Sequence, residues 1–128
     1  MEGAVNSAYE AVVTLAVQGP SGQTREIEAV IDTGFSGFLT VTPALVTELG
    51  LRYRSRGWAT LADGSEVTFP SYGVAVLWDG QRRYIDADAA DTTPLVGMRL
   101  LDGHSLHMDV LDGGRVAIAP VTAEPSTP

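Results

Sequence analysis

The sequence predicts an all-β domain, with the strands in a closed, barrel-like sheet and one or two short helices. Short runs rich in Val, Ile, Thr and aromatic residues recur along the chain, and Gly, Asp and Pro turn signals separate them at regular spacing. The 128 residues include 14 Gly and 7 Pro and are 45 % apolar, which is typical of a turn-rich globular protein. We expect one domain over residues 1-121 and a disordered Pro/Ser/Thr-rich tail over residues 122-128.

The first expected elements form a hairpin. Tyr9 to Val17 alternates loosely and is rich in Val, Gly19 to Gly22 supplies a turn, and Thr24 to Ile31 returns as the second strand. Phe38 to Val41 follows as a short apolar strand. These runs place a buried strand directly before residue 32.

A short helix is expected next. Thr42 is a suitable N-cap residue and Pro43 suits the first helical position. Ala44 to Leu49 supplies the body of the helix, and Gly50 ends it.

Asp-Gly pairs predict the remaining turns. The first of these hairpins covers Leu61 to Val67 and turns at Asp63-Gly64, the second joins Tyr72 to Trp78 with Arg82 to Ala87, and the last joins Leu106 to Leu111 with Arg115 to Ala119. Between the second and the last hairpin, we expect a buried strand at Leu95-Val96-Gly97 that leads into a short helix over Met98 to Leu101. We find no internal repeat.

Composition limits the possible functions. The net charge of −8 and the pI of about 4.5 argue against a nucleic-acid partner, because phosphate binding needs clustered basic residues. The absence of cysteine excludes disulfides and thiolate sites. The N-terminus does not read as a signal peptide, and no apolar run reaches membrane-spanning length, so we expect a soluble, cytoplasmic domain without a membrane partner.

The most informative stretch runs from Ala29 to Gly37. It places Asp32 at the end of an apolar strand, followed by Thr33, whose hydroxyl can orient a neighbour, and by Gly34, which lets a backbone or a ligand approach closely. This run resembles the active-site loop of the aspartic proteases, in which two apolar residues precede Asp-Thr-Gly and a Ser or Thr follows one residue later.

Three features occur in the order found in the single-lobe, retroviral-type (retropepsin-like) aspartic proteases and their bacterial relatives. They are the Asp32-Thr33-Gly34 loop, the hairpin at Asp63-Gly64 and the element Leu95-Val96-Gly97 before a short helix. The resemblance implies the aspartic protease fold, catalytic roles for Asp32, Thr33 and Gly34, and a flap in which Leu61, Ala62, Asp63 and Gly64 contact substrate. It implies no metal and no cofactor.

The chain departs from the viral members of that family. They usually carry Ala and then Asp after the triplet, where this chain has Phe35 and Ser36, so Arg99 lacks the acidic partner it would have there. The viral flap tip is rich in glycine, whereas this hairpin has only Gly64. Viral substrate preferences therefore do not transfer to this chain.

Peptide hydrolysis by this route needs a water held between two carboxylates. The chain contains one Asp-Thr-Gly and is too short for a second lobe, and Asp91-Thr92-Thr93 lacks the glycine and runs into Pro94. The economical solution is a two-fold homodimer in which Asp32 of each subunit meets its partner at the axis, with a peptide bound as an extended strand.

Other interpretations stay open at this stage. One is a catalytically silent peptide-binding or dimerisation module on the same fold, and another is a plain β structural module, which would be monomeric. His104 and His107, together with Asp109, suggest a metal site, but residues three apart in a strand point to opposite faces. Trp58 precedes the expected flap and is a candidate substrate contact.

Overall fold

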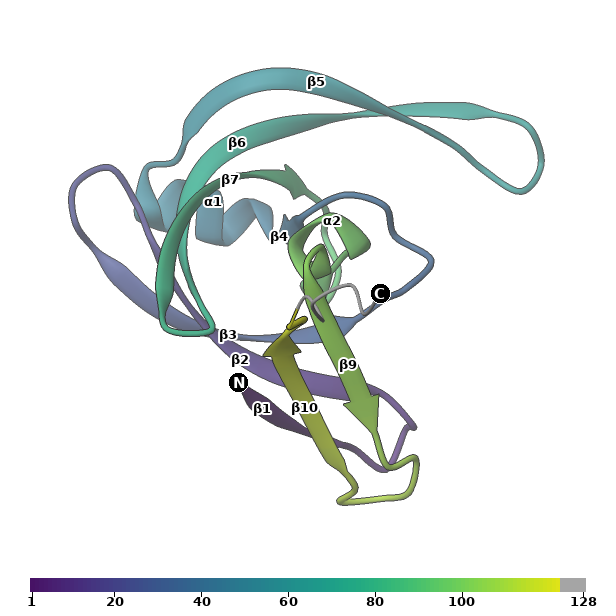
Figure 1. Ribbon diagram of the computed structural model, residues 1–128. Helices are drawn as coiled ribbons and strands as arrows, with labels where there is room; N and C mark the ends of the chain where they lie inside the picture. Colours follow the sequence, from purple (N-terminus) through teal and green to yellow (C-terminus); the bar gives the residue numbers. More distant parts are fainter. Residues whose placement is uncertain (123–128) are drawn as a thin grey trace, which may run out of the picture.

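The computed structural model describes residues 1–122, and these form ten strands and two short helices (Figure 1). The strands are β1 (Glu2–Val5), β2 (Ala11–Gln18), β3 (Thr24–Ile31), β4 (Leu39–Val41), β5 (Arg52–Thr60), β6 (Glu66–Trp78), β7 (Gln81–Ala89), β8 (Leu95–Val96), β9 (His104–Met108) and β10 (Arg115–Pro120). The helices are α1 (Pro43–Leu49) and α2 (Met98–Leu101). The mostly β architecture with two short helices is thus confirmed. Residues 123–128, almost all of the expected tail, lie outside the described residues.

All ten strands hydrogen-bond in one sheet, in the order β5-β6-β7-β4-β8-β3-β2-β1-β10-β9. An additional antiparallel pairing joins β6 to β2, where Val17 faces Val76, so the sheet returns onto itself between these two strands. Two pairings are parallel, β3 with β8 and β4 with β7. Strand β4 pairs antiparallel with β8 through Leu39 and Val96, so the ends of β3 and β8 lie beside the start of β4.

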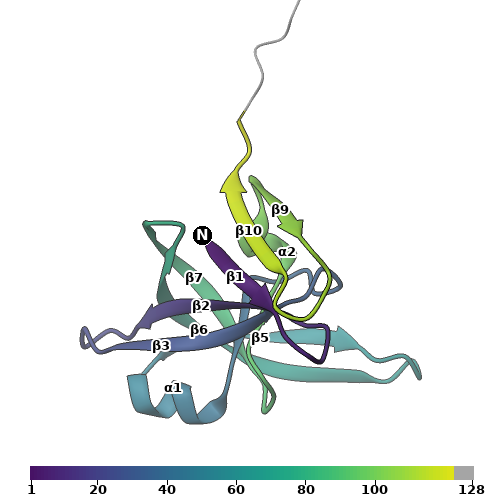
Figure 2. The same ribbon diagram turned by 90° about the horizontal axis from the view of Figure 1, so that it is seen from below.

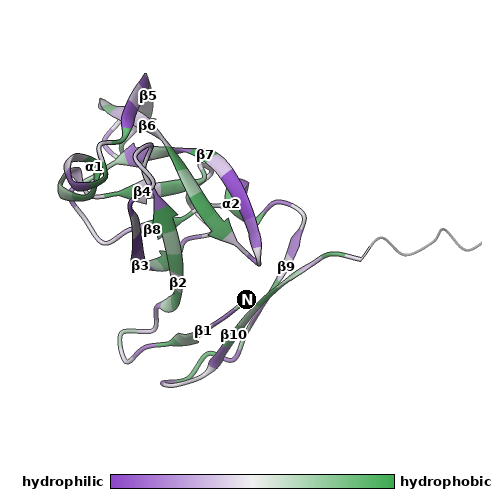
Figure 3. Ribbon diagram, turned by 90° about the vertical axis from the view of Figure 1, so that its left-hand side faces the viewer, coloured by the Kyte–Doolittle hydropathy of each residue, from purple (hydrophilic) through white to green (hydrophobic). Residues whose placement is uncertain are grey.

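The core follows from the alternation of side chains along the strands. In β2 the buried residues Val13, Leu15 and Val17 alternate with more exposed ones. Strands β2 and β8 are correspondingly green in the hydropathy view of Figure 3. Burial of this apolar surface provides the main driving force for folding. No helix in residues 1–122 is long and apolar enough to cross a membrane.

Helix α1 begins and ends where the sequence indicates. The Thr42 hydroxyl accepts a hydrogen bond of 3.2 Å from the amide of Leu45, Pro43 occupies the first turn, and Gly50 (φ 61°) ends the helix. Leu45 and Leu49, four residues apart, bury one face of the helix against the sheet core.

Strand β6 is longer than the sequence predicts. Val67 and the run from Tyr72 to Trp78 belong to one strand of 13 residues, which passes through Pro70. Pro70 pairs with Arg56 of β5, and the ladder to β7 begins one residue later, at Ser71. A proline fits here because the edge toward β7 is unpaired at this residue and needs no amide hydrogen.

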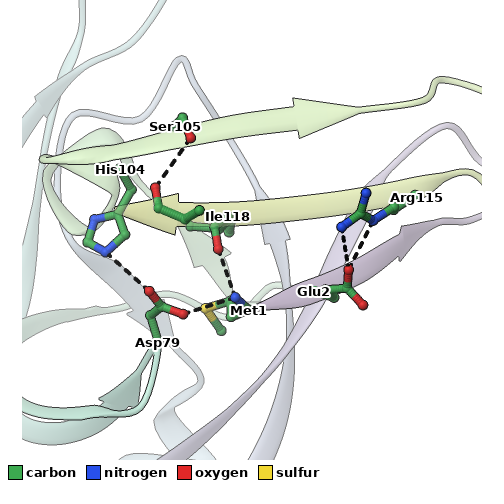
Figure 4. Close-up of polar contacts among 8 residues, drawn as sticks. Met1, Glu2, Asp79, His104, Ser105, Arg115 and Ile118 are labelled. Atoms are coloured by element: carbon green, nitrogen blue, oxygen red, sulfur yellow. Dashed lines mark hydrogen bonds and ion pairs between the residues drawn. The ribbon is translucent and has the colours of Figure 1, made fainter. Parts of the chain in front are cut away.

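The sequence does not predict the N-terminal strand β1. It lies between β2 and β10, and the Met1 amino group donates to Asp79 Oδ1 (3.0 Å) and to the Ile118 carbonyl (2.7 Å), as Figure 4 shows. Arg115 of β10 forms a hydrogen-bonded ion pair with Glu2 (2.7 Å) in the same view. These contacts hold the two ends of the described chain together.

In the last hairpin the second strand, β10, begins at Arg115 as predicted, whereas the first strand is displaced from its predicted bounds. Strand β9 begins at His104 and ends at Met108, so the expected strand over Leu106 to Leu111 is wrong in both limits. Asp109 and Leu111 instead accept amide hydrogen bonds from Leu111 and Gly114, which closes a compact loop before β10.

Candidate active site

Asp32 lies one residue beyond the end of β3, where β3 runs parallel to β8. The Val30 amide donates to the Pro94 carbonyl and the Asp32 amide donates to the Val96 carbonyl, both at 2.9 Å. Ile31 is the register partner of Val96. Because the backbone on both sides of Ile31 is hydrogen-bonded to β8, the backbone position from which the Asp32 side chain projects is fixed.

The residues after Asp32 form a loop that the start of α2 holds in place. The amides of Gly97, Met98 and Arg99 donate to the carbonyls of Phe38, Phe35 and Gly37, at 3.0, 2.8 and 3.1 Å. A Cβ on Gly97 would lie 2.1 Å from the Gly37 carbonyl oxygen, so this approach requires glycine. The structure therefore brings together the Asp-Thr-Gly loop and the apolar-apolar-Gly element that are about 60 residues apart in the sequence.

The Asp32 carboxylate accepts a hydrogen bond of 2.9 Å at Oδ1 from the Gly34 amide. The Phe35 amide donates to the Asp32 carbonyl at 3.1 Å, which closes the turn. Asp32 is partly buried, while Thr33 and Gly34 are exposed. Within the described residues Oδ2 accepts no hydrogen bond, so one oxygen of a well-positioned carboxylate is available to another group.

A cleft of about 620 Å³ begins beside this loop. Its walls come from the loop over residues 34–37, from the outer parts of β5 and β6, and from the end of β7. Figures 1 and 2 show the β5–β6 hairpin extending as a long two-stranded arm beyond the other strands. Asp32 does not line the cleft. Its Oδ1 accepts a hydrogen bond from the amide of Gly34, and Gly34 does line the cleft.

The residues expected at the flap occupy the turn of this arm. The Leu61 amide donates to the Ser65 carbonyl (2.8 Å), and the Gly64 amide donates to the Leu61 carbonyl (2.9 Å). Leu61, Ala62, Asp63 and Gly64 are all exposed, and none of them lines the cleft. The arm instead presents Trp58, Ala59, Thr60, Val67 and Phe69 to the cleft, from positions closer to the body of the molecule.

Asp63 has a local role in that turn. Its Oδ1 accepts hydrogen bonds from the hydroxyl and the amide of Ser65, at 2.6 and 2.9 Å. These bonds stabilise the charged form and hold the pKa of Asp63 below its ordinary value of 3.8.

Sequence reasoning missed a second carboxylate, Asp88, which lines the cleft from β7. The Ser71 hydroxyl donates to its Oδ1 at 2.7 Å, across the β6–β7 ladder in which the two residues are partners. Burial raises the pKa of Asp88 above 3.8, the hydrogen bond from Ser71 opposes that shift, and the charge of Asp86 adds to it.

The two histidines take part in separate contacts. His104 packs edge-on against the Trp78 ring, with 5.8 Å between centroids, and its Nε2 lies 3.9 Å from Asp79 Oδ2. His107 Nε2 lies 3.1 Å from Asp109 Oδ1. In residues 1–122 no group of three or more His, Asp or Glu is arranged to hold a metal ion. Arg99, which lacks the acidic partner of the viral enzymes, lies over the Phe38 ring at 5.9 Å.

Comparison with solved structures places this arrangement among known folds. A retropepsin-like aspartic protease from Rickettsia conorii superposes with a TM-score of 0.57 over 95 % of this chain and 91 % of that one, at 13 % identity. The chain has a retropepsin-like fold. The EIAV protease in complex with the inhibitor HBY-793 also superposes, with a TM-score of 0.54 over 75 % of this chain and 88 % of that one, at 17 % identity. The sequence matches no protein-family model and no curated protein.

Within the retropepsin-like fold, the predicted motifs of this chain lie at distinct places. The Asp-Thr-Gly loop is hydrogen-bonded to the apolar-apolar-Gly element and borders the cleft through Gly34, and the Asp63-Gly64 turn ends the arm that forms another wall. At these identities the similarity establishes the fold, and the chemistry has to be argued from the residues themselves.

Proposed function

We propose that this chain is an aspartic endopeptidase that works as a homodimer, with one Asp32 carboxylate from each subunit at the two-fold axis. The observation that carries the proposal is the geometry of Asp32. Backbone hydrogen bonds to β8 fix its position, Gly34 orients Oδ1, and Oδ2 accepts no hydrogen bond in the described chain. A carboxylate held in this way beside a cleft of about 620 Å³ is suited to act on a bound molecule.

Two such carboxylates supply the chemistry. One takes a proton from a water molecule as that water attacks the peptide carbonyl carbon, and the other, already protonated, donates a hydrogen bond to the carbonyl oxygen. Carboxylates about 3 Å apart do not both ionise, so the pair shares one proton and titrates as a unit. The exposed position of Thr33 and Gly34 leaves both residues accessible for contact across the axis.

The substrate in this proposal is a peptide in extended conformation. The cleft lies between the Asp32 loop and the β5–β6 arm, where a strand-like peptide can form main-chain hydrogen bonds and place alternate side chains on opposite sides. Trp58 and Val67 face the peptide from the arm. In this proposal Leu61 to Gly64, at the tip of the arm, contact the bound peptide, although they do not line the cleft within one subunit. The proposed mechanism uses no metal and no cofactor.

The test is cleavage of a peptide library by the purified chain, with Asp32→Asn and Asp91→Asn compared with wild type. Asp32→Asn keeps the shape of the side chain and removes the ionisable group, so cleavage should disappear while the fold and the dimer persist. Asp91→Asn makes the same change in an exposed Asp-Thr sequence outside the loop and should leave cleavage unchanged. Cleavage by Asp32→Asn at the wild-type rate would overturn the mechanism.

The alternative is a catalytically silent peptide-binding or dimerisation module on the same fold. It is favoured by the fact that the cleft walls are formed without Asp32 itself. The same experiment separates the two proposals, because a silent module binds library peptides equally well as wild type and as Asp32→Asn and cleaves none of them.

A further inference from the structure

The cleft contains a carboxylate that the proposed hydrolysis does not use. Asp88 enters it from β7 and is partly buried, with Oδ1 already bonded to the Ser71 hydroxyl at 2.7 Å. Its Oδ2 lies 3.5 Å from the position that a Cβ on Gly37 would occupy, so this oxygen borders the same loop that carries Asp32. Asp88 therefore lies within reach of a substrate that passes over that loop.

Asp88 has no positively charged partner in the described part of the chain. No Arg or His nitrogen of residues 1–122 lies within 4.0 Å of its oxygens, whereas its neighbour Asp86 pairs with Arg54 at 2.8 Å. A partly buried carboxylate with one hydrogen bond and no counter-ion is unfavourable when ionised, and burial raises its pKa accordingly. Such a group inside a cleft is a candidate for binding a ligand of complementary charge.

The surroundings of Asp88 also suit a long basic side chain. Phe35, Trp58 and Phe69 line the same cleft, and aromatic rings pack well against the methylene stem of Arg or Lys while the charged head reaches a carboxylate. An acidic substrate side chain would instead be repelled by the negative charge of Asp88. An aliphatic side chain would leave Oδ2 buried without a partner.

We infer that Asp88 is a specificity-determining residue, which makes this cleft select peptides with a basic side chain at one fixed position beside Gly37. The inference rests on the proposed peptide-binding function and adds the class of side chain that the cleft accepts. Ser71 is a positioning residue in this scheme, since it holds Oδ1 and so directs Oδ2 toward the cleft.

The experiment compares arginine with citrulline, which has nearly the same shape but no charge. A neutral ten-residue peptide is scanned with Arg and with citrulline at each position, and kcat/KM is measured for wild type, Asp88→Asn and Asp86→Asn. Asn at position 88 keeps the acceptor for Ser71, so the local structure should persist. Asp86→Asn removes an equal charge two residues away, outside the cleft, and is the matched control.

We expect wild type and Asp86→Asn to favour Arg over citrulline at one position by about tenfold or more, which is the range for a hydrogen bond to a charged group. In Asp88→Asn the ratio of kcat/KM for the Arg peptide to kcat/KM for the citrulline peptide should fall below about threefold. Equal rates for the Arg and citrulline peptides at every position in wild type, or a preference that survives in Asp88→Asn, would overturn the inference. Even if Asp88→Asn fails to fold, the wild-type comparison can overturn the inference, because it requires a preference for Arg at one position.

Binding to the Asp32→Asn chain distinguishes this inference from the proposed function. The dissociation constants of the same fluorescent Arg and citrulline peptides are measured on Asp32→Asn and on Asp32→Asn with Asp88→Asn. A preference for Arg that depends on Asp88 supports the inference even if no variant cleaves any peptide. Cleavage that depends on Asp32 without a preference for Arg would support the proposed function and contradict the inference.

Discussion

The two halves of β6 belong to one strand but have different surroundings. The inner half, from Ser71 to Trp78, pairs with β7 along its whole length and with β2 over three residues, and its Val76 is 1 % exposed. The outer half, from Glu66 to Pro70, pairs with β5 alone, and its Val67 is 39 % exposed. The core ends where the ladder to β7 ends.

This difference shows how one continuous strand can serve both as core and as the wall of a cleft. The inner half gains stability from partners on its edges and from burial, so moving it would disturb the whole sheet. The outer half has one partner strand and exposed side chains, so the free-energy cost of moving it is small. Residues on the arm should therefore affect substrate binding more than folding, and residues of the inner half the reverse.

The two tryptophans provide the largest test of this contrast. Trp78 in the inner half is 1 % exposed, while Trp58, paired with Thr68 of the outer half, is 69 % exposed. Trp78→Ala should lower the free energy of unfolding by about 3–5 kcal/mol, because it leaves a cavity in the core. Trp58→Ala should lower it by less than about 0.5 kcal/mol and should raise KM instead.

Urea denaturation and steady-state kinetics of both variants measure these quantities. Similar losses of stability for the two tryptophans would contradict the division of β6 into a core half and a cleft half.

Two glycines provide the next test. A Cβ on Gly97 would lie 2.1 Å from the Gly37 carbonyl oxygen, so Gly97→Ala should cost about 1–3 kcal/mol and also abolish cleavage by displacing the Asp32 loop. Gly64, at the tip of the arm, has open space around it but a φ of +85°, so Gly64→Ala should cost about 1 kcal/mol of backbone strain. Denaturation midpoints and cleavage rates should separate the two, and normal cleavage by Gly97→Ala would be inconsistent with the site described above.

The pH dependence of stability should show the smallest effect, with opposite signs for the two carboxylates. The folded-state pKa of Asp88 lies above 3.8, so the folded protein binds more protons there, and stability relative to Asp88→Asn should fall as pH rises through the window above 3.8. The pKa of Asp63 lies below 3.8, so its contribution is present above that pH and is lost as pH falls through the folded-state value. Thermal unfolding between pH 2 and pH 7 (about one point per half unit) measures both trends for wild type and the Asn variants. Trends of the same sign would show that the two environments do not differ as described.

The parts of the fold that could be predicted from sequence are those set by neighbouring residues. Helix α1 follows from Thr42 and Gly50, and the turn between β6 and β7 follows from Asp79-Gly80, where both residues have positive φ. Strand β1 could not be predicted, because its four residues carry no alternating pattern and depend on pairing with β2 and β10. The continuity of β6 was obscured by Pro70, which normally argues against a strand interior.

The candidate site shows the same limit. Asp32 could be proposed as a candidate from sequence because its whole context is local, from the apolar run before it to Gly34 after it. Asp88 could not, since Asp86, Asp88 and Asp91 look equivalent in the sequence, and only the register of β6 with β7 places Ser71 opposite one of them. Trp58 precedes the expected flap in the sequence, which made it a candidate substrate contact; it lines the cleft, and contact with substrate stays a prediction.

The shared pair of Asp32 carboxylates is the central claim, and subunit mixing tests it most directly. Wild type at fixed concentration is co-refolded with increasing amounts of Asp32→Asn, and cleavage is measured with excess peptide. If each active site needs Asp32 from both subunits, random pairing leaves about half of the wild-type subunits active at an equimolar ratio and about a tenth at a ninefold excess of the variant. Cleavage that stays constant as the variant is added would mean that each chain works alone, and the homodimeric mechanism would be wrong.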